Sequence, residues 1–250
     1  MEPRLAFFGD LHLSNRKQDL ARDVFCQTLE KLAEDSYTHI IFLGDIFDLL
    51  IGPKSFWKKR HAQFFDCLNK LNEKNISIVW VEGNHDFHFK KLFANYSNLK
   101  IVEEDYDLII GNFKLFLSHG DKVNRSDLSY LRWRRITKSK LFRGFLNLIP
   151  SFLGELAVLP LAEKASKSSR KRSRESISSE LKKLYLDFAR QKISENYTGV
   201  VLGHNHSFTF ENIGENAFYL NLGAPSENSL SYATWNPKIE AKPIIQKIDF

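Results

Sequence analysis

The chain has 250 residues, 43% of them hydrophobic, which suits one sizeable globular domain and excludes a largely disordered protein. No apolar run reaches the roughly 18 residues of a membrane-spanning helix, and the first residues lack a signal-peptide pattern, so we expect a cytoplasmic protein. The net charge of +6 is uneven: residues 122–183 carry 16 Lys and Arg against 5 Asp and Glu, and such a basic segment is typical of contact with nucleic acid, anionic lipid or phosphorylated ligands.

The first part of the chain alternates predicted strands and helices. Apolar runs predict strands, and apolar periodicity predicts helices, in the order Arg4–Gly9 (strand), Asp19–Leu32 (helix), His39–Leu43 (strand), Phe56–Leu71 (helix) and Ile76–Val81 (strand). This order favours a layered α/β fold. Cys26 and Cys67 fall within the two helices without the spacing of metal ligands, so we expect buried, reduced thiols.

The later part of the chain adds antiparallel strands on both sides of a helical segment. Strand-like runs occupy Leu99–Val102, Tyr106–Ile110, Phe113–Leu117, Phe208–Ile213, Ala217–Leu222, Leu230–Trp235 and Ile239–Ile248. Between them lie an apolar stretch, a Lys/Arg/Ser run and an amphipathic helix, at Leu141–Leu161, Lys164–Arg174 and Ile177–Ile193. We expect a single domain over residues 1–250, in which residues 122–196 form a helical insertion that acts as a lid over the polar edge of the sheet.

Five apolar runs end in Asp, Asn, His or Gly residues. The motifs are Asp10-Leu11-His12, Gly44-Asp45, Gly83-Asn84-His85-Asp86, Ser118-His119-Gly120-Asp121 and Gly203-His204-Asn205-His206. Each motif alone is typical of an ordinary turn or cap, but the ordered set at strand ends predicts one metal site. Its donors lack thiolates and suit Mn²⁺, Fe²⁺, Zn²⁺ or Mg²⁺. Seven donors suit two octahedral ions that share a carboxylate, and they are Asp10, His12, Asp45, Asn84, His119, His204 and His206.

In this order and spacing, the motifs resemble those of the calcineurin-like metallophosphoesterases. The resemblance runs from Asp10 to His206 and implies an α/β double-sheet sandwich flanked by helices, with two divalent ions at the carboxyl ends of the strands. It implies Mn²⁺ as the expected metal and a bridging hydroxide as the nucleophile. One ion would be held by Asp10, His12, Asp45 and His206, and the other by Asp45, Asn84, His119 and His204. His85 would steady the phosphate or protonate the leaving group, and Asp86 would orient His85.

A narrower resemblance is to the UDP-2,3-diacylglucosamine hydrolases, peripheral membrane enzymes of lipid A synthesis that release UMP and a diacylglucosamine 1-phosphate. It is carried by residues 9–14, 43–48, 83–87, 119–121 and 203–206 and by the basic insertion. The chain departs from the group at His85, where many of those enzymes carry arginine.

That resemblance implies an acylated sugar-nucleotide substrate. Residues in contact with it would be Asn84, His85, Asp127, Tyr130, Ser166, Arg170 and His204. The apolar stretch Leu141–Leu161 would form a trough for the acyl chains, and the basic residues would face anionic lipid on the cytoplasmic side of the inner membrane. No obligate protein partner is inferred.

Two other functions remain open. One is another metal-dependent phosphodiesterase, such as a nuclease, a nucleotide phosphodiesterase or a phosphatase, because the aromatic and arginine residues from Tyr130 to Arg135 suit nucleic acid. The apolar stretch argues against nucleic acid, because a polyanion offers such a stretch nothing to bind. The other is a binding module on an inactive scaffold, which would need none of the seven donors. In the simplest alternative for the insertion, Leu141–Leu161 is ordinary core and Lys164–Arg174 a solvated loop.

Overall fold

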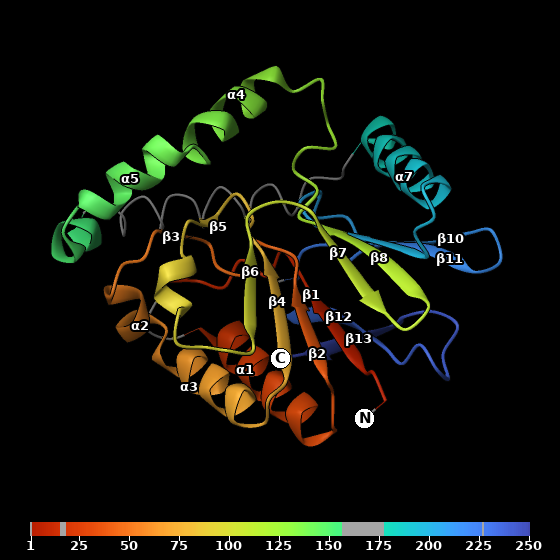
Figure 1. Ribbon diagram of the computed structural model, residues 1–250, viewed down its shortest axis with the longest axis horizontal. Coiled ribbons are helices and arrows are strands. Elements are labelled where there is room, and N and C mark those ends of the chain that lie inside the picture. The colour runs from red at the N-terminus through yellow and green to blue at the C-terminus, as the bar shows by residue number, and fades with distance from the viewer. Residues whose placement is uncertain (1, 16–18, 157–177, 227) are drawn as a thin grey trace.

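Two β-sheets packed face to face form the body of the computed structural model, which describes residues 2–15, 19–156, 178–226 and 228–250 (Figure 1). The larger sheet has the order β13-β12-β1-β2-β4-β6, from β1 (Leu5–Phe8), β2 (His39–Phe42), β4 (Ser77–Val81), β6 (Leu99–Val102), β12 (Ser229–Trp235) and β13 (Ile244–Asp249). The smaller has the order β10-β11-β9-β8-β7, from β7 (Tyr106–Ile110), β8 (Phe113–Ser118), β9 (Gly199–Leu202), β10 (Thr209–Ile213) and β11 (Ala217–Asn221). The structure therefore has the predicted double-sheet α/β architecture.

Parallel pairing brings the ends of the central strands to common edges. Strands β1, β2 and β4 are parallel and in register, with Phe8 opposite Phe42 and Phe42 opposite Trp80. In the other sheet β8 and β9 are parallel, with Ser118 opposite Leu202. Each of the five strands thus finishes level with its neighbour, and the motif that follows it begins at the same edge.

Strict alternation along the strands divides the core into layers. Leu5 and Phe7 of β1 point between the sheets, whereas Ala6 and Phe8 belong to the cluster on the outer face. Helices α1 (Leu20–Glu34) and α3 (Ala62–Glu73) cover that outer face. Helix α7 (Ser179–Ser194) covers the outer face of the smaller sheet. The order of layers is helix, sheet, sheet, helix, and Cys26 and Cys67 are buried free thiols as predicted.

Four local features differ from the sequence expectations. The helix predicted over Phe56–Leu71 is two helices, α2 (Phe56–Arg60) and α3, because His61 leaves helical geometry between them (φ −114°, ψ 36°). A two-stranded parallel sheet of β3 (Leu50–Ile51) and β5 (Asp86–Phe87) was not predicted, since runs of two residues carry no periodicity. A 3₁₀ turn spans Lys90–Phe93, and the last strand begins at Ile244 rather than Ile239.

The chain between β8 and β9 is largely helical where it is described. Helices α4 (Leu128–Thr137) and α5 (Lys140–Leu148) begin at Asp127 and Ser139, whose side chains accept hydrogen bonds from the main-chain nitrogens of Tyr130 and Phe142. Residues 151–156 are also helical. The predicted contacts Ser166 and Arg170, and the run Lys164–Arg174, lie outside the described residues. Within the described ranges, none of the helices has the length and apolarity to cross a bilayer.

Candidate metal centre

The residues of the motifs adopt an unusual backbone at the strand ends. Non-glycine residues with positive φ are uncommon and cost on the order of 1–3 kcal/mol each, so they persist where the surrounding structure enforces them. Five of the seven predicted donors have positive φ, namely Asp10 (51°), His12 (46°), Asp45 (52°), His204 (72°) and His206 (57°). This concentration of strained backbone at one edge of the sandwich is typical of a functional site.

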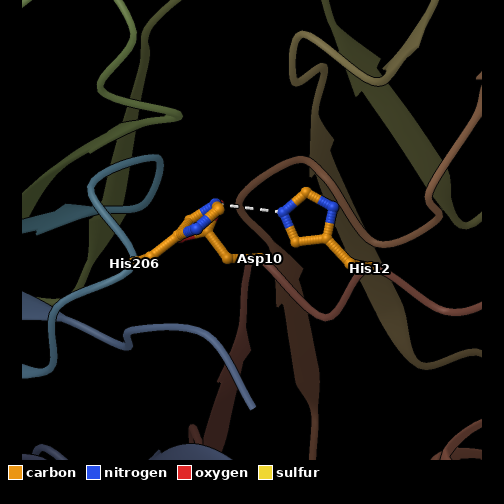
Figure 2. A group of neighbouring side chains, drawn as sticks. All are labelled: Asp10, His12 and His206. Carbon is orange, nitrogen blue, oxygen red and sulfur yellow. Dashed lines mark hydrogen bonds between the residues drawn. The ribbon is translucent and has the colours of Figure 1, made fainter. Parts of the chain in front are cut away.

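One group of donors comes from the loops after β1 and β9. Asp10, His12 and His206 offer ligand atoms that all lie within 4.8 Å of one another. Figure 2 shows the ring of His12 facing His206, and their Nε2 atoms are 3.0 Å apart. Two elements nearly 200 residues apart in sequence thus direct imidazole nitrogens at one point.

A second group lies beside the first and shares Asp45. Asp45, His119 and His204 also place ligand atoms within 4.8 Å of one another. The amide oxygen of Asn84 is 3.0 Å from His119 Nε2 and 2.9 Å from His204 Nδ1. Asp45 Oδ2 lies 3.5 Å from His119 Nε2 and 3.9 Å from His12 Nε2, which places this carboxylate between the two groups. All seven predicted donors therefore meet at one place.

The electrostatics of this place suit bound cations. Burial disfavours the charged ring of His119, but the carboxylates of Asp45, Asp10 and Asp121 together outweigh it and raise the pKa of His119 to about 10. Burial raises the pKa of Asp10 to about 8, although the charged His119 opposes this. Without a metal the site thus retains protons at groups that a cation would bind in their deprotonated form. The nitrogen and oxygen donor set fits divalent ions such as Mn²⁺, Fe²⁺, Zn²⁺ or Mg²⁺.

Main-chain groups orient one ring and one carboxylate of the donor set. His119 Nδ1 lies 2.8 Å from the carbonyl oxygen of Leu43, so a proton on Nδ1 leaves the Nε2 lone pair directed at Asp45 and Asn84. The main-chain nitrogen of His204 donates to both oxygens of Asp10, at 2.9 and 2.7 Å. Such outer hydrogen bonds fix the direction of metal ligands before any ion arrives.

Close approach of two loops explains the glycines of the motifs. A Cβ added to Gly83 would lie 2.1 Å from Asp45 Oδ1, and one added to Gly44 would lie 2.6 Å from the Cα of Gly83. Side chains at these positions would push the β2 and β4 loops apart. The glycines therefore allow Asp45 and Asn84 to reach the same point.

His85 is held at the edge of the donor groups. Its main-chain nitrogen donates to Asp45 Oδ1 at 2.8 Å, and its ring Nδ1 lies 2.8 Å from the carbonyl oxygen of Asp48. Its ring centroid is 5.0 Å from that of His12. A ring nitrogen of His85 also lies within 4.8 Å of ligand atoms of Asp45 and His12, so the ring is near enough to act on a substrate bound there.

Asp86 has a different role from the predicted one. Its carboxylate accepts hydrogen bonds from the main-chain nitrogens of Gly83, Asp45 and Ile46, at 2.8, 2.9 and 2.8 Å, and its side chain is fully buried. The His85 ring instead meets Asp48. Adjacent residues of extended chain project to opposite sides, so Asp86 points into the protein and holds the β2 and β4 loops together.

Asp48 was missed by the sequence reasoning. Its carboxylate is fully buried, with Oδ1 3.8 Å from His12 Nδ1, and its carbonyl oxygen contacts the His85 ring. The signal was the second aspartate in Gly44-Asp45-Ile46-Phe47-Asp48. A carboxylate beside the far nitrogen of a histidine favours the tautomer that points its other nitrogen at a metal.

Of the predicted lid contacts, Tyr130 lies next to the centre. Its ring centroid is 5.4 Å from that of His204, and its hydroxyl donates to Asp121 Oδ2 at 2.9 Å. Arg134 Nε donates to the same oxygen at 2.6 Å, so α4 is attached to the His119-Gly120-Asp121 loop. Asp127 is exposed and caps α4, accepting from Tyr130 N at 2.9 Å.

Comparison with known proteins gives one family. The family model for calcineurin-like phosphoesterases matches residues 3–237. The UDP-2,3-diacylglucosamine hydrolase of Psychromonas ingrahamii is 28% identical over 154 residues, 60% of each chain, so this chain spans less than two thirds of that relative in the match. The enzyme of the same name from Histophilus somni is 27% identical over 218 residues, 84% of this chain and 86% of that one. A solved archaeal phosphodiesterase is 14% identical with a TM-score of 0.49, covering 97% of this chain and 99% of that one, a likeness too distant to bear on function.

Proposed function

Because the chain belongs to the calcineurin-like phosphoesterase family and is therefore a metal-dependent phosphoester hydrolase, we propose that it hydrolyses the pyrophosphate of UDP-2,3-diacylglucosamine to UMP and 2,3-diacylglucosamine 1-phosphate. The observation that carries the proposal is the meeting of seven nitrogen and oxygen donors beside a helical arm with an exposed apolar face. The names of the relatives supply the substrate class.

The donors would divide between two ions, with Asp45 common to both groups. Asp10, His12, Asp45 and His206 would hold one ion, and Asp45, Asn84, His119 and His204 the other. When bound, two divalent ions would supply Lewis acidity: they would polarise phosphoryl oxygens and lower the pKa of a water molecule, so that hydroxide is available to attack phosphorus near neutral pH. We propose Mn²⁺, with Mg²⁺, Fe²⁺ or Zn²⁺ as alternatives.

His85 serves the leaving group. With Nδ1 directed at the Asp48 carbonyl, the other ring nitrogen is available to a phosphoryl oxygen of the substrate. A protonated ring donates a hydrogen bond there and can transfer the proton to the departing phosphate oxygen. Asp86 keeps the two loops, and therefore His85 and Asp45, in place.

The arm, which we define as residues 128–156, would receive the lipid part. Its exposed apolar side chains include Leu141 and Leu148, which are 86% and 82% exposed, together with Phe145, Phe152, Leu153 and Leu156. A group of large apolar side chains exposed on one arm suits a binding site for lipid or protein. Arg132, Arg135 and Lys140 are exposed on the same arm and suit anionic headgroups. We propose a cytoplasmic enzyme that sits peripherally on the inner membrane.

The test is a turnover assay with two substrates. Purified protein is incubated with Mn²⁺ and either UDP-2,3-diacylglucosamine in mild detergent or bis(p-nitrophenyl) phosphate, and UMP or nitrophenolate is measured. We expect UMP, lost on chelation and in Asp45→Ala. A protein that cleaves the small diester but releases no UMP refutes the proposed substrate. Deletion of residues 141–174 should remove only the activity on the acylated substrate.

Another phosphodiesterase function is favoured by one observation. Trp133 is 45% exposed between Arg132 and Arg135, an arrangement that can stack on a base and neutralise a phosphate. Tyr130 and Arg134 of the same stretch are instead committed to Asp121. Cleavage of single-stranded RNA or DNA in the same assay, reduced in Trp133→Ala, would favour this alternative.

A further inference from the structure

A buried lysine of the body holds the far end of helix α5. Lys54 lies in the loop between β3 and α2 and is only 5% exposed. Its ammonium group donates hydrogen bonds to the carbonyl oxygens of Leu146 and Ile149, in the last turn of α5 and at its C-cap. Carbonyl groups at a helix C-terminus lack partners within the helix and carry negative partial charge, so an ammonium there satisfies both needs.

Other contacts also join the far end of the arm to the body, including an ion pair between Arg60 and Glu155 at 3.8 Å. Leu146 is buried, and its Cβ lies 3.7 Å from the place of a Cβ on Gly52. The hydroxyls of Ser55 and Ser151 are 2.9 Å apart. Gly154 approaches the body so closely that an added Cβ would lie 3.5 Å from the ring of Phe56. The far end of the arm therefore rests on residues 52–56.

The near end of α5 is attached separately, to residues that flank the Gly83-Asn84-His85-Asp86 motif. Lys138 Nζ lies 3.3 Å from Glu82 Oε2, with side-chain exposures of 8% and 0%. His88 Nε2 lies 2.8 Å from the carbonyl oxygen of Thr137. Glu82 directly precedes the Gly83-Asn84 motif, so this attachment ties the start of α5 to the centre. Arg143, within α5, pairs with Glu103 at 2.6 Å, and the contacts at Lys54 hold the far end of the helix.

The two attachments share one scaffold. Strand β3, which leads into the Lys54 loop, pairs with β5, where Leu50 lies opposite Asp86. Figure 1 shows α5 running along the side of the molecule where β3 and β5 lie. The inner face of α5 meets this small sheet through Phe142, whose ring centroid is 6.5 Å from those of Phe87 and His88.

We propose that Lys54 is a specificity-determining positioning residue. It fixes the direction of α5 relative to the metal centre, so that the apolar outer face meets the lipid part of a substrate whose phosphates lie at the metal ions. Lys54 itself touches neither the reacting atoms nor the substrate. The specificity role rests on the proposed function, whereas the anchoring of α5 can be tested without any substrate.

The test compares Lys54→Met with Lys58→Met, which removes an exposed lysine from α2 nearby. Methionine keeps the aliphatic stem and removes the ammonium. With Mn²⁺, we expect Lys54→Met to raise KM for UDP-2,3-diacylglucosamine about tenfold or more and to leave kcat within about threefold. Kinetics on bis(p-nitrophenyl) phosphate should match those of Lys58→Met. Lys54→Arg, which restores a cation, should bring KM most of the way back to the wild-type value.

Hydrogen exchange provides the second readout. Amides in α5 should exchange faster in Lys54→Met than in Lys58→Met, while those of β1, β2 and β4 stay unchanged. Equal KM values and equal α5 exchange in the two variants would overturn the proposal, as would an equal loss of activity on both substrates. If the wild-type protein cleaves the diester but not the acylated sugar nucleotide, the proposed substrate fails, and the exchange comparison alone decides whether Lys54 anchors α5.

Discussion

The loss of folding stability at acid pH should report on His61, the residue that separates α2 from α3. Its ring packs against those of Phe47 and Trp57, with centroids 4.2 and 5.8 Å away, and its Nε2 lies 2.9 Å from Asn15 Oδ1. Burial, and then the charges of Arg22 and Arg60, lower the pKa of His61 from 6.5 to about 3. The folded protein therefore holds this ring neutral, whereas the unfolded chain protonates it below pH 6.5.

The sign and size follow from proton linkage. A depressed histidine pKa contributes stability that is present above pH 6.5 and is lost as the pH falls toward 3. Each pH unit in this window removes up to about 1.4 kcal/mol, so lowering the pH from 7 to 5 should remove about 2 kcal/mol through His61 alone. Other buried histidines, including His12 and His204, add to the loss in the metal-free protein.

A difference measurement isolates the His61 contribution. The free energy of unfolding of metal-free protein is measured by urea titration at pH 7, 6 and 5, for the wild type and for His61→Gln, whose amide can still donate to Asn15 but does not titrate. We expect the variant to be less stable at pH 7 and to have a shallower pH dependence, so that the two values converge by about 2 kcal/mol at pH 5. Parallel curves would refute the assignment of a neutral, buried His61.

Three further changes test the centre. His85→Ala should lower kcat by about 10²–10⁴-fold while retaining bound Mn²⁺, because the ring acts on the leaving group; loss of metal, measured by elemental analysis, would make it a ligand instead. Asp86→Ala leaves three main-chain donors without their acceptor and should weaken Mn²⁺ binding about 10–100-fold by calorimetry; unchanged affinity would contradict its loop-holding role. Gly83→Ala should abolish metal binding in a protein that keeps its circular dichroism spectrum, because its Cβ would meet Asp45 Oδ1 at 2.1 Å; normal binding would show that the loops can separate.

Local sequence predicted the secondary structure correctly where a single segment determines it. The runs His39–Phe42 and Ser77–Val81 form strands as their apolar composition predicts, and α1 follows its apolar periodicity. The break at His61 was not predictable in this way, because the surrounding residues continue a helical pattern. At the break the His61 ring meets the side chain of the distant Asn15, a contact that forms only in the folded protein.

The sequence by itself determined the chemistry of the centre, because oxygen and imidazole donors follow five apolar runs, and parallel strands must finish at common edges. Only the tertiary structure decided which groups support those donors. Asp86 turned out to bind the main chain of two loops rather than its neighbour His85. Lys54 meets carbonyl groups 92 and 95 residues further along the chain, a pairing that no local pattern encodes because a buried ammonium takes whichever acceptors the packing of α5 presents.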